Sequence, residues 1–215
     1  MVRKGAYASL FIAGLATVAV GCGSDSSDDV ADAGRNLARA PDLQGAWVST
    51  CDGFGVGPLQ LSGKAYYAFE PLQYKKKIAL YADKQCATQN AEVRYTGEFN
   101  IGNSDDLPEG QNRVDLVPKT IVVKATSQAG VDALNAAKLC GVSDWTINAS
   151  RDVTAAAKQG DCLAERIEAT QYDVYSLDDK TLRFGSAYLL GAPTKAESRP
   201  SKLNERVFQP SEKWE

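Results

Sequence analysis

Cysteine is the residue type in this chain with the clearest chemical potential, because histidine is absent. The 215 residues include five cysteines and no histidine. Without an imidazole the chain contains no Ser-His-Asp triad, no Cys-His pair and no His-ligated zinc or copper site. The cysteines are also spaced too widely for a compact thiolate metal site. We therefore expect no metal, no cofactor and no catalytic residue, and we interpret the cysteines as sites of covalent modification or cross-linking.

Carboxylates form two clusters in the sequence, at Asp105, Asp106 and Glu109 and at Asp178 and Asp179. Both clusters lie among Asn, Ser, Gly and Pro residues, which are typical of turns. A calcium-binding interpretation of the first cluster lacks the ligand spacing of a known loop. We interpret both clusters as solvated bends and predict that the protein is not an enzyme.

The first cysteine ends an N-terminal segment that is organised like an export signal. Arg3 and Lys4 precede an apolar run over residues 6–20, and Gly21 and Cys22 follow it. The run is short for a membrane-spanning helix and is preceded by positive charge, which is typical of a removable secretory segment. The sequence therefore predicts that the protein works outside the cytoplasm.

Small residues directly before this cysteine resemble the lipobox of bacterial lipoproteins. Val20 and Gly21 fit the pattern, whereas Ala19 replaces the branched residue that the family prefers. The resemblance implies cleavage before Cys22, a lipid on that cysteine and a membrane as partner, and Gly23 in place of Asp favours the outer membrane of the cell envelope. In the alternative interpretation, an ordinary signal peptidase cuts nearby and leaves a thiol. Cysteine parity argues for lipidation, because four cysteines then remain to pair in an oxidising compartment.

The four remaining cysteines permit three sets of two disulfides. They are Cys51, Cys86, Cys140 and Cys162. We favour Cys51 with Cys86 and Cys140 with Cys162. Each pair would close a loop of roughly 20 to 35 residues and stabilise the fold by about 3 to 4 kcal/mol through the restricted unfolded chain.

The chain divides into a signal, a tether and one domain. Residues 1–21 are the predicted signal, and residues 22–40 form a tether of small and acidic residues with too little apolar surface to fold. Residues 41–215 are long enough for a single domain with its own core. Removal of the signal takes away Arg3 and Lys4, so the formal charge changes from −3 to −5. An acidic surface is unsuited to nucleic acid, and we expect no nucleic-acid partner.

Apolar and polar residues alternate through most of this domain with the period of β-strands. The clearest run is residues 92–102, in which Val93, Tyr95, Phe99 and Ile101 alternate with polar residues. The other predicted strands cover residues 65–70, 76–82, 113–116, 120–125, 145–148, 172–177, 181–184 and 206–208. Within this pattern Pro118 predicts a turn or a sheet edge.

One helix is predicted over residues 129–139, with Gly141 closing it in the left-handed conformation, and a second short helix around residues 155–158. The lysines at 75, 76 and 77 are interpreted as a solvated strand start that discourages edge pairing, with contact to anionic headgroups as the alternative. Many short strands with one helix predict an antiparallel β-barrel, with a β-sandwich as the alternative.

Gly45, Ala46 and Trp47, at the start of the first predicted strand, resemble the Gly-x-Trp motif of lipocalins and related calycins. The resemblance implies an eight-stranded up-and-down barrel with Trp47 at one end and a basic residue packed over its indole by cation–π attraction. Arg206 is the residue expected in that role, and Arg183 is the second choice. In the alternative interpretation, Trp47 is a core aromatic residue of an unrelated sandwich.

The predicted barrel is of a size that can hold one small ligand. Tyr95, Phe99, Tyr172 and Phe184 would line an apolar cavity, and Phe54 in a glycine-rich loop would gate it. We therefore predict a non-enzymatic, membrane-anchored envelope lipoprotein that binds a small apolar ligand. The alternative is a protein-interaction module, an envelope inhibitor or assembly factor, with a filled barrel.

The size of the residues that face the barrel interior separates these two functions. Gly97 and Ala82 are small and would leave a void, whereas Tyr95, Phe99 and Ile101 are large and would fill it. The sequence by itself leaves this evidence mixed.

Overall fold

The computed structural model describes most of the chain from Leu43 onward. The described residues are 43–56, 59–71, 73–160, 162–163, 166–178, 180–186, 191–212 and 214. The predicted signal, the tether and the lipidation residue Cys22 lie outside this set. Phe54 is described by its backbone alone.

Ten strands form a single sheet in the described part of the chain. They are β1 (Gly45–Ser49), β2 (Asp52–Val56), β3 (Leu59–Phe69), β4 (Tyr74–Tyr81), β5 (Gln89–Ile101), β6 (Gln111–Ala125), β7 (Ser150–Asp152), β8 (Gln171–Asp178), β9 (Thr181–Phe184) and β10 (Phe208–Pro210). The helical segments are α2 (Gln128–Ala137), η2 (Leu139–Gly141), α3 (Thr154–Lys158) and η3 (Ala196–Ser198). The described chain is therefore mainly β, and its two short α-helices lie at the two positions where the sequence predicts helices.

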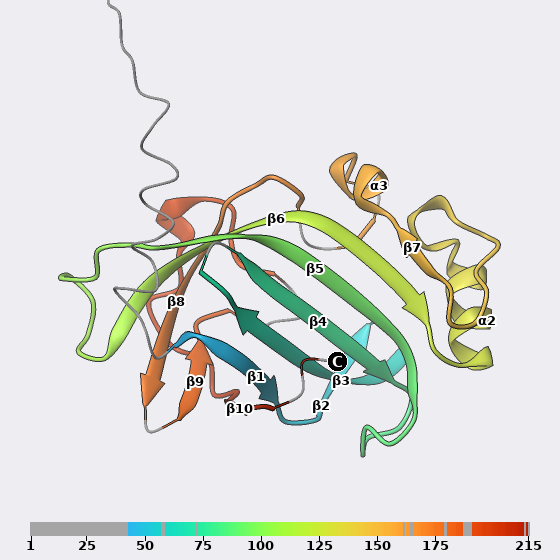
Figure 1. Cartoon of the computed structure of the whole chain (residues 1–215), viewed down its shortest axis with the longest axis horizontal. Coiled ribbons are helices and arrows are strands. Elements are labelled where there is room, and N and C mark those ends of the chain that lie inside the picture. The colour runs from blue at the N-terminus through green and yellow to red at the C-terminus, as the bar shows by residue number, and fades with distance from the viewer. Residues whose placement is uncertain are drawn as a thin grey trace, which may run out of the picture.

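Eight of these strands close into an antiparallel barrel (Figure 1). The hydrogen-bonded order is β1-β10-β9-β8-β6-β5-β4-β3, and the pairing of β1 with β3 joins the two ends of this row. Consecutive barrel strands are neighbours, so the topology is up-and-down. The barrel predicted from the sequence is confirmed, and it has the architecture of lipocalin-like barrels.

The first long strand is broken where it leaves the barrel. Val48 pairs with Tyr66 of β3, whereas Asp52 pairs with Gly63, so three residues of the first strand face two of β3. An extra residue of this kind is a bulge, which bends a strand. The Ser49 hydroxyl accepts a hydrogen bond from Ala65 N at 2.9 Å and supports the break. As a result β1 pairs with both β3 and β10, and β2 pairs with β3.

Strand β6 changes partners along its length. Residues 111–116 pair with β8, and residues 122–124 pair with β7. Pro118 lies between these two segments, opposite Gly97 of β5 at a shift in register. Pro118 is not a turn, since it lies inside β6, but neither β7 nor β8 pairs with it, so it lies at a local edge as the sequence predicts; a proline is tolerated at such an edge and at a bulge.

The helices α2 and α3 lie beside the C-terminal half of β6 (Figure 1). Ser127 caps α2 by accepting a hydrogen bond from Gly130 N, and Lys138 ends it in the left-handed conformation at φ 45°. The helix thus ends before the predicted Gly141. Residues 145–148, predicted as a strand, form a loop in which the side chain of Asn135 holds the backbone of the buried Trp145. None of the helices in the described residues is long and apolar enough to cross a membrane.

Candidate functional site

The barrel interior contains a cluster of aromatic rings in mutual contact. Tyr67 lies with its ring centroid 4.9 Å from that of Phe184 and 5.5 Å from that of Phe208. Phe69 lies 5.2 Å from Phe99 and 6.5 Å from Phe184. The alternation of side chains along β3, β5, β9 and β10 directs all five rings inward. Centroid distances of this size are those of packed aromatic pairs in protein cores.

Three of the four residues predicted to line a cavity share this interior. Tyr95, Phe99 and Phe184 are 3%, 5% and 4% exposed and belong to one hydrophobic core. Tyr172 lies elsewhere, on the face of β8 opposite to the buried Tyr175. Its ring is covered from outside the barrel by Arg199, whose guanidinium carbon is 5.1 Å from the ring centroid.

The two small residues that favoured a cavity do not open one. A Cβ added to Gly97 would lie 2.7 Å from a ring carbon of Tyr74, so this ring already occupies the space beside the glycine. Ala82 is exposed in the bend after β4 and does not face the interior. Among the described residues, the inner face is therefore dominated by large side chains.

One of the three consecutive lysines also points inward. Lys76 is 2% exposed, and its ammonium lies 5.6 Å from the ring centroid of Tyr67 and 5.3 Å from that of Tyr95. Lys77 points outward and lies 4.1 Å from the ring of Tyr66. The prediction of a solvated strand start is wrong for these two residues, because β4 pairs on both sides and is not an edge.

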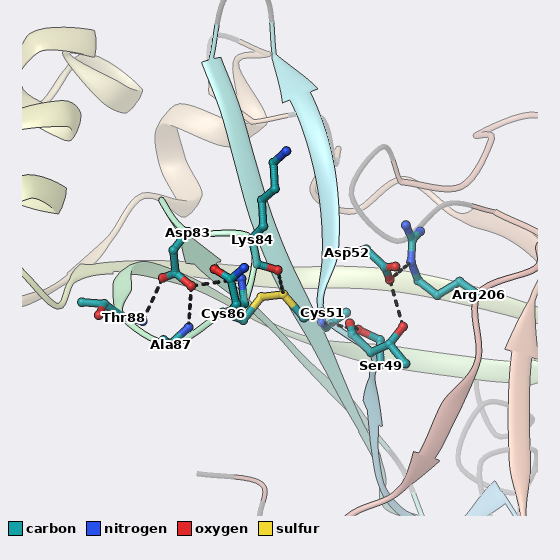
Figure 2. Close-up of a disulfide and its surroundings, with 12 residues drawn as sticks. Ser49, Cys51, Asp52, Asp83, Lys84, Cys86, Ala87, Thr88 and Arg206 are labelled. Carbon is teal, nitrogen blue, oxygen red and sulfur yellow. Dashed lines mark hydrogen bonds and ion pairs between the residues drawn. A yellow bond between two sulfur atoms is a disulfide. The ribbon is translucent and has the colours of Figure 1, made fainter.

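Trp47 and Arg206 occupy neighbouring elements. Trp47 is buried, and its indole N–H donates to the carbonyl of Leu43 at 2.9 Å. Arg206 precedes β10, the strand that pairs with β1, and its Nε donates to Asp52 Oδ2 at 2.6 Å (Figure 2). Packing of Arg206 over the Trp47 indole stays a prediction. The structure does place an arginine over a different indole, that of Trp145, with the Arg151 guanidinium carbon 5.8 Å from the ring centroid.

The cysteines form the two disulfides that we favoured. Cys51 and Cys86 join the bulge after β1 to the turn between β4 and β5, with 5.9 Å between their Cα atoms (Figure 2). Cys140 and Cys162 cross-link the segment around α3 to η2, with a Cα separation of 4.6 Å. Two disulfides are typical of a protein that folds in an oxidising, extracytoplasmic compartment.

Backbone hydrogen bonds organise the turn that holds Cys86. The carboxylate of Asp83 accepts from the N–H groups of Gln85, Ala87 and Thr88 at 3.1, 2.9 and 3.0 Å (Figure 2). These bonds, the one from Ala87 first, hold the pKa of Asp83 below its ordinary value. The Asp83 carboxylate therefore holds the turn around Cys86 in shape.

The structure contains one unusual group that the sequence does not predict, the buried carboxyl of Asp173 in β8. Asp173 pairs with Val114 of β6 and is 4% exposed. Burial raises its pKa to about 6, although hydrogen bonds from the backbone of Val174 and Ser186 act in the opposite direction. An aspartate within a run of alternating residues carries no signal of such burial, so only the structure could reveal it.

The fold and the interior together define the class of this protein as a disulfide-linked, lipocalin-like β-barrel with an aromatic core. Comparison with protein families and with curated proteins gives no match to the chain. The described residues contain no group of three cysteine or acidic side chains that could hold a metal ion.

Proposed function

We propose that the protein is a lipid-anchored lipoprotein of the bacterial cell envelope whose barrel is a filled scaffold for binding another protein. The observation that carries the scaffold is the contact between interior rings, because a carrier needs space where these rings meet. The ring centroid of Phe184, for example, lies within 6.5 Å of those of Tyr67, Phe69 and Phe208. A packed interior leaves the loops and the outer surface as the places where recognition occurs.

The anchor in this proposal is a lipid on Cys22, and its location is the outer membrane. Both rest on the resemblance of the N-terminal segment to a lipobox. The two disulfides support export, since they belong to an oxidising compartment. Labelling of cells with a radioactive fatty acid tests the anchor. Incorporation into the full-length protein and its loss in Cys22→Ser are the expected results, and labelling of the variant would contradict the proposal.

The carrier function predicted from the sequence is the second candidate, and Lys76 is the observation that favours it. A buried ammonium between Tyr67 and Tyr95 is the kind of polar group that orients a ligand in an apolar site. A small apolar ligand with one anionic group would suit this position. The aromatic rings would then have to move apart to admit it.

Native mass spectrometry separates the two candidates. Residues 23–215, exported to a periplasm and purified without detergent, should give the same mass before and after denaturation. A reproducible extra mass that is released on denaturation would overturn the filled scaffold and establish the carrier.

A cavity-making variant provides a matched control for the filled interior. Phe184→Ala removes a ring with three ring neighbours and should create a site for a fluorescent apolar probe that the unmodified protein does not bind. Arg183→Ala, on the exposed face of the same strand, should bind none. Equal binding by the unmodified protein and Phe184→Ala would show that the barrel is already hollow.

Photo-crosslinking in cells tests the protein partner. The exposed loop between β5 and β6 is a candidate contact, and a photoreactive residue at Asp105 or Glu109 should give a discrete adduct of higher mass. The same residue at Glu98, exposed on the barrel wall, serves as the comparison. Absence of an adduct at both loop positions would argue against recognition through this loop.

A further inference from the structure

The segment that follows β10 is attached to the outside of the barrel, and we call residues 211–214 the tail. Ser211 N donates to the carbonyl of Ala46 on β1 at 2.8 Å. The carbonyl of Trp214 accepts a hydrogen bond from Lys77 Nζ on β4 at 3.1 Å. Because β3 lies between β1 and β4 in the barrel, these attachments hold the tail on both sides of β3.

The wall beneath the tail is the outer face of β3 and β4. Alternation along the strands directs Tyr66 of β3 and its partner Lys77 of β4 outward. Lys77 is 5% exposed, although a lysine on a barrel wall normally extends into water. On the same face, the buried Ala79 and Tyr81 form an apolar cluster with Tyr66 and the disulfide of the β4–β5 turn. The outer face is therefore partly apolar, and it is covered at Lys77.

Basic side chains gather on this face. They occupy outward positions of three neighbouring strands and are Lys64, Lys75, Lys77 and Arg94. Lys77 lies directly opposite Arg94, and like charges in such a pair repel each other. Glu70 and Glu92 offset two of these charges through ion pairs with Lys75 and Arg94. In a chain with more acidic than basic residues, a basic face favours an acidic occupant.

The tail shows which kind of occupant fits this face. It contains one acidic residue, Glu212, and one half-buried aromatic residue, Trp214. Lys77 binds a backbone carbonyl, which every peptide offers, and the ring of Tyr66, 4.1 Å from the ammonium, holds the donor in place by cation–π attraction. A short segment on the outside of a barrel opens locally without unfolding the strands, so another chain can take its place.

We propose that the outer face of β3 and β4 around Tyr66 and Lys77 is a binding site for an extended, acidic peptide with an aromatic residue, and that the tail occupies this site in the free protein. A segment of the same chemistry from a partner protein displaces the tail. The partner rests on the proposed function as a scaffold, whereas the site and its occupation by the tail do not.

Acetylation of lysines by an amine reagent, followed at each lysine by mass spectrometry, tests this proposal in the exported chain. Lys77 should react slowly because the tail covers it. In the full-length variant with Glu212→Lys and Trp214→Ala, Lys77 should react about tenfold faster, since the variant loses the charge and the ring that hold the tail on the face. Lys119, whose side chain on β6 is 41% exposed, should react equally in both proteins.

A separate peptide should then restore the protection. A millimolar excess of a peptide with the sequence of residues 211–215 should slow the acetylation of Lys77 in the variant about tenfold. The same peptide with Glu212→Lys and Glu215→Lys should leave the rate unchanged, because its charge no longer complements the face. All rates are divided by that of Lys119, since the lysines of the peptides also consume reagent.

Three outcomes would overturn the proposal. Equal acetylation of Lys77 in the unmodified chain and the variant would show that the tail does not cover the face. Failure of the first peptide to protect Lys77 would show that the face does not bind peptides. Protection by vesicles of anionic lipid but not by the peptide would assign the face to a membrane contact. Each outcome leaves the filled scaffold to be decided by native mass spectrometry, so the two proposals fail separately.

Discussion

Burial of the Asp173 carboxyl links the stability of the protein to pH. Its pKa of about 6 in the folded chain lies above the ordinary value of 3.8, so the unfolded chain releases this proton first as the pH rises. Stability from this group is complete below about pH 4 and is lost progressively up to about pH 6, where the loss reaches about 3 kcal/mol. Asp173→Asn should therefore be more stable than the unmodified protein at pH 7.5, by about 1 to 3 kcal/mol.

Urea unfolding at pH 4 and pH 7.5 measures this difference. The comparison between the two proteins cancels the contribution of carboxylates with lowered pKa values, such as Asp83 and Glu92, which act in the opposite direction as the pH falls. The expectation is that the gain in free energy of unfolding from Asp173→Asn is larger at pH 7.5 than at pH 4. An equal gain at the two pH values would contradict it.

Gly97 is required by close packing rather than by its backbone angles. A Cβ at this position would collide with the carbonyl of Val117 and with the ring of Tyr74. Gly97→Ala should lower the free energy of unfolding by about 1 to 3 kcal/mol, the usual range for overpacking. Gly53→Ala, in β2, meets nothing within 4 Å and is the matched control. Equal effects in urea unfolding would show that the interior tolerates an added methyl group.

Each disulfide joins two particular elements of the fold, so the two disulfides should stabilise different regions. Cys51 and Cys86 close a loop of 35 residues and hold the β1–β2 bulge against the β4–β5 turn. In the chain-entropy model their replacement by alanine lowers the free energy of unfolding by about 4 kcal/mol, and replacement of Cys140 and Cys162 lowers it by about 3 kcal/mol. Urea unfolding of the two double variants measures both effects.

Hydrogen exchange distinguishes the regions that the two disulfides control. Loss of the Cys51–Cys86 bond should increase exchange in β2 and in the turn at Asp83. Loss of the Cys140–Cys162 bond should increase it in η2 and α3 and leave β4 unchanged. A uniform increase in both variants would show that neither disulfide acts locally.

Sequence patterns predicted the strands best where both neighbours are strands. In β5 the alternation correctly indicates the inward-facing residues, which are Val93, Tyr95, Phe99 and Ile101. The reason is that one face of this strand packs in the barrel interior and the other faces solvent. The loop at Trp145 was predicted as a strand, since apolar residues in a short run carry no information about whether a partner edge is within reach. The ends of α2 were also misplaced, because Lys138 adopts the left-handed conformation that glycine usually supplies.

At the scale of the molecule, closure of the barrel depends on its shortest strand. In the described part of the chain, β10 (Phe208–Pro210) is the strand that bridges β1 and β9. A chain that ends at Asn204 should expose both edges and aggregate, since unpaired edges recruit other strands. A chain that ends at Ser211 retains β10 and should remain a single species. Size-exclusion chromatography measures the difference, and a monodisperse short chain would show that closure does not need β10.

The sequence by itself determined the β class, the strand pattern of β5 and the expectation of an exported, disulfide-linked domain. These features are local or compositional: an alternation with period two, an N-terminal apolar run and a count of cysteines. The aromatic residues of the interior could be named for the same reason, since Tyr95, Phe99 and Phe184 belong to regular alternating runs.

Only the tertiary structure decided which side chains share an environment. Tyr172 faces outward, Lys76 faces inward, and the carboxyl of Asp173 is buried. Each outcome depends on register, because a shift of one residue reverses the face on which a side chain lies. Strand registers are set by bulges and by partner strands far away in the chain. The sequence does not predict them because closure of the barrel fixes all the registers together.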